Sequence, residues 1–124
     1  MGMRQDEVHV VVVDDDADSR DVVQALLELD GYRVTTVPDA DAALNAVATW
    51  KPLCVILDLH MPRVNGVELA RRLREAHGAN LVLIVLTASA SPTDHRDAEI
   101  AGVDYVMQKP LDTALLRRML PRIE

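Results

Sequence analysis

Residues 8–16 read Val-His-Val-Val-Val-Val-Asp-Asp-Asp, a mostly β-branched apolar run that ends in three aspartates. Three further apolar runs precede a polar side chain: 53–57 before Asp58, 81–86 before Thr87, and 105–107 shortly before Lys109. Short apolar runs of this kind predict parallel strands that are buried on both faces. Because ligands of open parallel sheets bind outside the carboxyl ends of the strands, we expect these polar groups to meet at one edge. Together they suit a divalent cation and a phosphoryl group.

The composition indicates a single globular domain. The chain has 124 residues, enough for one core, and no apolar run approaches the roughly 18–20 residues of a membrane span. The amino terminus lacks the apolar stretch of a signal peptide. Cys54, the single cysteine, lies within an apolar run and is expected to be a buried structural thiol. These features predict a reducing, cytoplasmic setting.

The charge argues against direct binding of nucleic acid. Thirteen basic and twenty acidic residues give a formal net charge of −7. Proteins that bind nucleic acids neutralise phosphates with clusters of Lys and Arg, whereas the arginines here are scattered over predicted solvent-facing positions.

Strands and helices are predicted to alternate five times along the chain. The predicted helices are 18–30, 39–50, 66–76, 92–101 and 112–120. In the second helix we expect Trp50 on the buried side, and the fourth helix has so few apolar residues that it should be lightly anchored. Strict alternation requires a parallel sheet with right-handed crossovers. The predicted class is therefore α/β, a doubly wound sandwich.

The acidic triplet Asp14–Asp16 is expected to bind a metal ion. Clustered carboxylates repel one another unless a cation lies between them, and Mg²⁺ needs only one or two carboxylates besides other oxygen ligands and water. Capping of the following helix is the alternative interpretation. Capping accounts for one aspartate but not for three.

The other three polar residues each have an ordinary structural explanation. Asp58 could be a turn residue, Thr87 the β-branched end of a strand, and Lys109 a surface lysine before a turn. At the edge of a sheet that carries carboxylates, Lys109 would instead offset their charge and bind a phosphoryl group as a point charge. The order and spacing of the whole set favour the functional interpretation.

The complete set resembles the receiver (response-regulator) family of bacterial two-component signalling. The resemblance extends from Val8 to about Ile123, so we expect residues 1–124 to form one receiver domain with its core at about 8–123. The segments that carry it are Val11–Asp15, Ile56–Gly66, Val85–Ala88 and Gly102–Pro110. It implies a flavodoxin-like (βα)5 fold with strand order 2-1-3-4-5.

The resemblance also implies a role for each site residue. Asp58 would accept a phosphoryl group from a histidine of a partner and form an acyl phosphate. Thr87 and Lys109 would hold phosphoryl oxygens, and the small Ala88 would leave room for the group to enter. Mg²⁺, or Mn²⁺, would be bound by Asp15, Asp58 and the backbone carbonyl of His60, with Asp14 acting mainly through water.

The implied partners are proteins. The phosphoryl donor would be a sensor histidine kinase or a histidine phosphotransfer protein, and the output an unknown protein, without nucleic acid or membrane. The domain would be a monomer, or a weak dimer through the face made by the fourth helix, fifth strand and fifth helix. It would not be an enzyme, beyond self-phosphorylation from small donors and self-dephosphorylation. No output domain is expected after Glu124, which leaves a stand-alone regulator or a receiver excised from a hybrid kinase.

Two positions depart from the family pattern or vary within it. The family usually has an aromatic residue three positions before the lysine, where this chain has Val106, and strand alternation sends its neighbour Tyr105 to the opposite face. The fourth helix and the loop before it would then move without a ring switch. His60, two residues after Asp58, is interpreted as an exposed loop histidine in preference to a direct participant in hydrolysis.

Two rival functions fit less well. A phosphatase of the haloacid dehalogenase type requires Asp-x-Asp-x-Thr/Val after the first strand, and Asp18 occupies the last position of that motif here. A flavodoxin-like cofactor binder requires a Ser/Thr/Gly-rich phosphate loop at the same place, which the acidic triplet does not provide.

Overall fold

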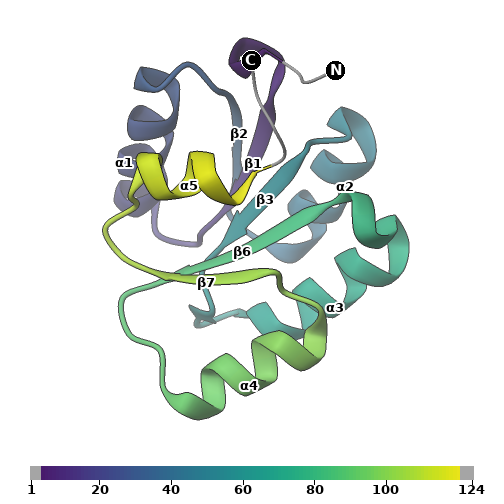
Figure 1. Ribbon diagram of the computed structural model, residues 1–124. Helices are drawn as coiled ribbons and strands as arrows, with labels where there is room; N and C mark the ends of the chain where they lie inside the picture. Colours follow the sequence, from purple (N-terminus) through teal and green to yellow (C-terminus); the bar gives the residue numbers. More distant parts are fainter. Residues whose placement is uncertain (1–3, 121–124) are drawn as a thin grey trace.

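A computed structural model describes residues 4–120 of the chain. Its main sheet has five parallel strands in the order β2-β1-β3-β6-β7 (Figure 1). These strands are β1 (His9–Val13), β2 (Arg33–Val37), β3 (Cys54–Leu57), β6 (Val82–Thr87) and β7 (Tyr105–Gln108). Numbered along the chain within this sheet they follow the order 2-1-3-4-5, so the predicted fold is confirmed.

Five α-helices connect these strands and cover both faces of the sheet. They are α1 (Ala17–Leu29), α2 (Ala40–Trp50), α3 (Gly66–His77), α4 (Pro92–Ala101) and α5 (Thr113–Met119). Short 3₁₀ turns are formed by η1 (Gln5–Glu7) and η2 (Gly78–Asn80). The sequence did not predict the small antiparallel pair β4 (His60–Met61) and β5 (Val64–Asn65), which lies in the loop after β3. The predicted end of the domain near Ile123 lies outside the described residues.

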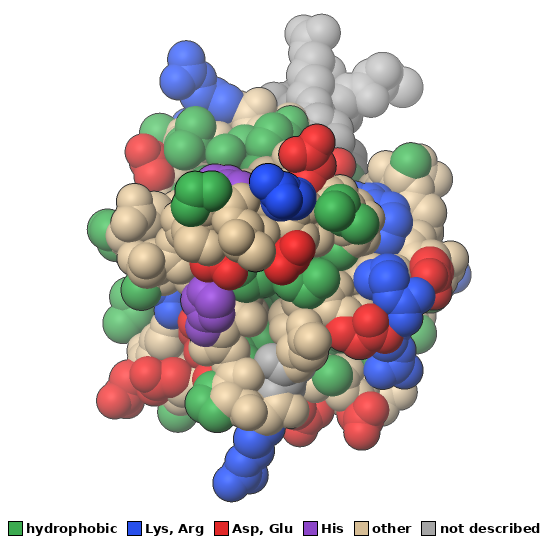
Figure 2. Space-filling view, turned by 90° about the horizontal axis from the view of Figure 1, so that it is seen from below, with side chains coloured by type: hydrophobic (Ala, Val, Ile, Leu, Met, Phe, Trp, Pro, Cys, Tyr) green, Lys and Arg blue, Asp and Glu red, His purple; other side chains and the backbone are tan. Residues whose placement is uncertain are grey.

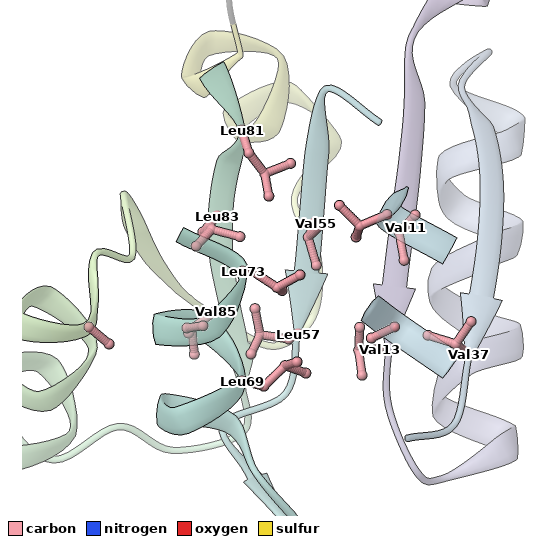
Figure 3. Packing of buried hydrophobic residues seen from close by; sticks show 14 of the residues in the cluster. Val11, Val13, Val37, Val55, Leu57, Leu69, Leu73, Leu81, Leu83 and Val85 are labelled. Atoms are coloured by element: carbon pink, nitrogen blue, oxygen red, sulfur yellow. The ribbon is translucent and has the colours of Figure 1, made fainter. Parts of the chain in front are cut away.

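Alternate residues of the central strands point to opposite faces and build two separate cores. On one face Val11, Leu57 and Val85 pack with buried residues of α2, α3 and α4 (Figure 3). On the other face Val12 and Ile56 pack with buried residues of α1 and α5. The central strands therefore bury side chains on both faces, as the continuous apolar runs predicted. Cys54 is fully buried, and this burial raises the pKa of its thiol.

Each helix begins at a side chain that accepts a hydrogen bond from its first turn. The N-cap residues are Asp16, Asp39, Asn65, Ser91 and Asp112. Such caps satisfy backbone N–H groups that have no partner within the helix. The prediction that one aspartate of the triplet caps the first helix is confirmed by Asp16, whose carboxylate accepts from the Asp18 amide.

Two predictions about packing have different outcomes. The prediction that Trp50 is buried is wrong, because it is 51% exposed at the end of α2 and its ring lies 5.1 Å from that of His9. The prediction for α4 is confirmed in that it buries only Ala98 and Ala101, while Ile100 is exposed. A polar contact adds to this weak apolar packing, since the Arg74 guanidinium of α3 donates to the carbonyl of Gly102.

None of the helices within residues 4–120 has both the length and the apolar character that crossing a membrane requires.

Candidate functional site

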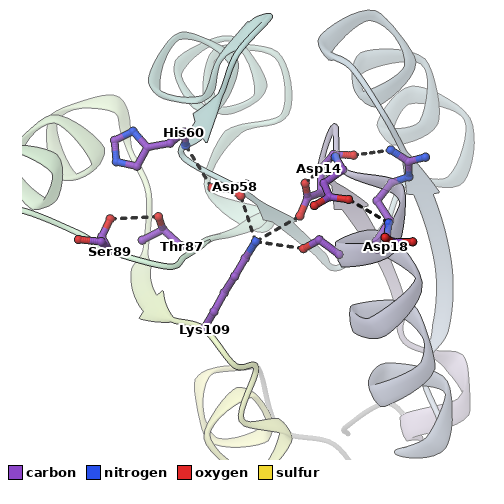
Figure 4. A network of polar contacts seen from close by, with 10 residues as sticks. Asp14, Asp18, Asp58, His60, Thr87, Ser89 and Lys109 are labelled. Atoms are coloured by element: carbon purple, nitrogen blue, oxygen red, sulfur yellow. Dashed lines mark hydrogen bonds and ion pairs between the residues drawn. The ribbon is translucent and has the colours of Figure 1, made fainter.

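The Lys109 ammonium lies between two carboxylates at the carboxyl edge of the sheet (Figure 4). Its Nζ atom is 3.1 Å from Oδ2 of Asp58 and 3.4 Å from Oδ2 of Asp14. It also donates to Oγ of Ser19, at 3.0 Å, in the first turn of α1. Residues that are 51 and 95 positions apart in sequence therefore meet at one point, as the strand pattern predicted.

Backbone pairing of the strands positions both carboxylates. The Asp14 amide donates to the carbonyl of Val37 in β2, and the Asp58 amide donates to that of Val13 at the end of β1. Asp14 is almost fully buried, and its second oxygen, Oδ1, accepts from the Asp16 amide. Oδ1 of Asp58 accepts from the His60 amide at 3.1 Å. The side chain of Asp58 keeps 15% of its surface exposed, against 5% for Asp14.

Pairing with the adjacent strand β6 holds the backbone of Lys109 in place. Its backbone amide donates to the carbonyl of Thr87 at 2.8 Å, which continues the pairing of β7 with β6. Burial of the ammonium lowers its pKa, but the hydrogen bond to Asp58 and the charges of Asp58 and Asp14 outweigh this, so the pKa of Lys109 is raised. The side chain therefore carries a positive charge throughout the neutral range.

Thr87 lies at the end of β6 but does not contact the carboxylates. Its side chain is buried, and its hydroxyl donates to the carbonyl of Ser89 at 3.1 Å. The following residue, Ala88, is exposed, and its carbonyl accepts from the Gln108 side chain. Thr87 is thus at the predicted edge of the sheet, with its hydroxyl held by its own loop.

The acidic edge has the donor chemistry of a magnesium site. Asp14 and Asp58 lie on either side of the Lys109 ammonium, and Asp15 projects from the same loop into solvent. Within residues 4–120 no group of three or more His, Cys, Asp or Glu side chains is arranged to hold a metal ion. Mg²⁺ usually retains several waters and binds one or two carboxylates. Asp14 and Asp58 thus supply the one or two carboxylates that a partly hydrated hard cation would take.

Gly66 lets the chain pass close to the loop that follows Asp58. A Cβ atom at this position would lie 2.8 Å from the carbonyl oxygen of Asp58 and 2.9 Å from that of Leu59. Both oxygens belong to the backbone, so they can move only if the loop moves. The conformation of the loop after Asp58 therefore depends on the missing side chain.

We predict that Gly66→Ala destabilises the protein by about 1–3 kcal/mol, the usual cost of overpacking. Without a clash, alanine would stabilise a helix by up to about 1 kcal/mol relative to glycine, so the sign of the change is diagnostic. Urea unfolding followed by circular dichroism measures it. An unchanged or higher stability would contradict the close approach.

Sequence reasoning missed two partners of the site residues. Ser19 contacts Lys109. Nothing in the sequence marks this serine apart from its place in the first turn after the acidic triplet. Asp94 lies in α4, and its Oδ2 atom is 3.1 Å from Nε2 of His60. The exposed position predicted for His60 is correct, with 58% of its side chain accessible. The interaction of His60 with Asp94 was not predicted. The pKa of the Asp94 carboxyl is lowered, mainly by the hydrogen bond from the Ser91 amide and to a smaller extent by His60.

The structure places Val106 and Tyr105 on opposite faces of β7, as strand alternation predicted. Val106 is half-buried and packs against the core on the side of α2, α3 and α4. Tyr105 is 40% exposed. No bulge in the β6–β7 pairing redirects the ring, because the two strands pair residue by residue from Ile84 with Tyr105 to Thr87 with Gln108.

Basic and acidic side chains are mixed on the face of the molecule that Figure 2 draws. Figure 2 shows blue and red side chains next to each other on this face, without an extended basic patch among the described residues. Arg71 of α3 pairs with Glu68 and Glu75. This face lacks the concentrated positive charge that phosphate-backbone binding requires.

The doubly wound sheet and its acidic edge define a class of α/β proteins that bind ligands outside the carboxyl ends of their strands. The family model of the response regulator receiver domain matches residues 10–121. The chain therefore belongs to the response regulator receiver domain family, which is a family of signalling domains.

Individual relatives agree with this assignment. The chain is 37% identical over 122 residues to the response regulator MprA of Mycolicibacterium vanbaalenii, covering 92% of this chain and 52% of MprA. It is 36% identical over 115 residues to an uncharacterized 14.6 kDa protein of Leptolyngbya boryana, covering 92% and 88%. The chemotaxis protein CheY4 of Vibrio cholerae has a similar structure, with a TM-score of 0.85 at 26% identity, covering 91% and 98%. The chain thus spans about half the length of MprA and most of the other two.

Proposed function

We propose that Asp58 accepts a phosphoryl group from a phosphohistidine of a sensor kinase or histidine phosphotransfer protein. A carboxylate oxygen of Asp58 would attack phosphorus, the bond between phosphorus and the donor imidazole nitrogen would break, and an acyl phosphate would form. One observation carries this proposal: at the carboxyl edge of the sheet, Nζ of Lys109 lies within 3.4 Å of a carboxylate oxygen of both Asp58 and Asp14.

Accessibility favours Asp58 over Asp14 as the nucleophile. The Asp14 side chain is only 5% exposed. The Asp58 side chain is three times as exposed, at 15% against 5%. A donor imidazole can therefore reach Asp58 more readily than the almost fully buried Asp14.

The neighbouring residues would stabilise the transferring group. The Lys109 ammonium is already 3.1 Å from an Asp58 oxygen and can follow the negative charge onto the phosphoryl oxygens. The Thr87 hydroxyl would donate to another phosphoryl oxygen after leaving Ser89. Ala88 offers no side chain beyond its methyl group at the entrance. Fixed positive charge and donors of this kind are the main way in which proteins assist phosphoryl transfer.

The acidic residues would bind Mg²⁺, with Mn²⁺ as a substitute. Asp15 and Asp58 would be direct ligands together with the backbone carbonyl of His60, and Asp14 would act mainly through water. When bound, the cation neutralises the charge that builds up on the phosphoryl oxygens. Oxygen donors dominate the site, which favours such hard cations over softer metals.

The domain would act by protein contact in the cytoplasm. Phosphorylation adds negative charge at the sheet edge and would shift an existing equilibrium of the Thr87 loop and α4. We propose α4, β7 and α5 as the surface read by the downstream protein, or by a second copy in a weak dimer. A stand-alone regulator and a receiver from a larger hybrid kinase both fit these residues.

The proposed function predicts a metal-dependent covalent adduct. Incubated with Mg²⁺ and acetyl phosphate, the protein should gain one phosphoryl group by intact-mass spectrometry. Excess EDTA should abolish the adduct, and added Mg²⁺ should restore it, because carboxylates near a phosphoryl donor repel it unless a cation intervenes. An adduct that forms equally well in EDTA, or none in Mg²⁺, would contradict the proposal.

A further inference from the structure

A side-chain contact links the loop after Asp58 to the start of α4. His60 donates its backbone amide to Oδ1 of Asp58, at 3.1 Å, while its ring lies 3.1 Å from Oδ2 of Asp94. These two residues are 34 positions apart in sequence. A path of two contacts therefore runs from Asp58 through His60 to α4. In Figure 4 the His60 ring is turned away from Asp58, so the ring is placed to hold α4 and not to activate water at Asp58.

Asp94 is also the residue that fixes the beginning of α4. Its Oδ2 atom accepts from the Ser91 amide at 2.9 Å, and its own amide donates to Oγ of Ser91 at 3.1 Å. This reciprocal pair is a capping box. The His60 ring approaches the same Oδ2 atom, so the contact fastens the cap itself to the loop after β3.

The contact between His60 and Asp94 lies next to the loop that must change its conformation when Thr87 binds a phosphoryl group. Residues 88–91 connect Thr87 to α4, and the Thr87 hydroxyl donates to the carbonyl of Ser89 within this loop. To donate to a group on Asp58, the hydroxyl has to leave Ser89. A tether at the far end of so short a loop favours the conformation in which Thr87 stays bound to Ser89.

We propose that the interaction between His60 and Asp94 is a tether that stabilises the unphosphorylated conformation of the Thr87 loop. His60 and Asp94 are then positioning residues that set how readily the site accepts a phosphoryl group. This inference rests on the proposed function of Asp58 and adds its regulation by a pair that joins the loop after β3 to α4. A competent conformation that is populated only in part lowers the apparent affinity of its ligand in proportion. Release of the tether should therefore strengthen binding.

Beryllofluoride with Mg²⁺, a mimic of the phosphoryl group, tests this inference. We expect His60→Ala to tighten its binding by about two- to fivefold, the range that a partly exposed contact between two polar side chains provides. The affinity is measured from backbone amide resonances of residues 87–91 in isotope-labelled protein. His60→Gln should return the affinity toward the native value, because its amide can donate to Asp94.

A double-mutant cycle separates the contact from other effects of each residue. Asp94→Ala also removes the capping-box hydrogen bond from the Ser91 amide. Because the double variant lacks this bond as well, its loss cancels in the cycle. His60→Ala should therefore have no further effect in the Asp94→Ala background. His77→Ala, which removes an imidazole at the end of α3, should keep native affinity. Equal effects of His60→Ala in both backgrounds, or none in the native background, would overturn the tether. A native protein that does not bind beryllofluoride would instead contradict the proposed function.

Discussion

Asp58→Asn is expected to abolish phosphorylation by acetyl phosphate in the presence of Mg²⁺. An amide has nearly the shape of a carboxylate, so the variant should keep the hydrogen bond from the His60 amide to Oδ1 and hence the conformation of the loop. It lacks the anionic oxygen that attacks phosphorus. The neighbouring carboxylate of Asp14 is too buried to replace it. The adduct measured by intact mass should fall below detection.

Asp16→Asn is the matched control for this variant. It makes the same chemical change two residues from Asp14, and asparagine caps helices as well as aspartate does, so α1 should keep its N-cap. The control should be phosphorylated like the native protein. Persistent phosphorylation of Asp58→Asn would show that another side chain is the nucleophile, and loss in Asp16→Asn would show that any change of charge in this region is enough.

Lys109→Met is expected to slow phosphorylation while strengthening the binding of Mg²⁺. Methionine keeps the length of the side chain but removes the charge 3.1 Å from Asp58 and 3.4 Å from Asp14. Loss of one preorganised charge at a transferring group costs on the order of 10²–10³-fold in rate. The same ammonium competes with a metal cation for the two carboxylates, so its removal should lower the dissociation constant of Mg²⁺. Opposite changes in rate and metal affinity distinguish this role from general damage.

Lys51→Met provides the control, since Lys51 is the only other lysine of the chain and lies at the C-cap of α2. It should change neither quantity. A Lys109→Met protein that is phosphorylated at the native rate would contradict the role of the ammonium.

The raised pKa of Lys109 makes the stability of the protein depend on pH. Its contribution to stability is complete below the ordinary lysine pKa of about 10.4 and is lost only as the pH rises through the raised folded-state value.

The sequence was sufficient to predict the fold and the edge where the site lies. The runs 8–13, 53–57 and 81–86 are so uniformly apolar that only strands buried on both faces account for them, and these strands carry Asp14, Asp58 and Thr87 to one edge. Local signals also gave the helix starts at Pro92 and after Asp112. These features depend on residues close together in the chain, which is why they can be read without the structure.

Features that depend on distant residues could not be predicted in this way. The pairing of His60 with Asp94 and that of Lys109 with Ser19 depend on how a loop and the start of a distant helix approach in space. Trp50 follows the helical spacing of the buried stripe, yet it is the last residue of α2, and its ring lies half exposed against His9 at the start of β1. Helical periodicity shows which side of a helix is apolar but not how far the sheet extends along it.

The most direct test of the central claim is the chemical location of the phosphoryl group. The protein is incubated with Mg²⁺ and acetyl phosphate and then treated with borohydride, which reduces an acyl phosphate to an alcohol and releases phosphate. Peptide mass spectrometry should then find homoserine in place of aspartate at position 58 and at no other aspartate. Homoserine at position 14 or 15, or none at all after incubation, would contradict the assignment of Asp58 as the phosphoacceptor.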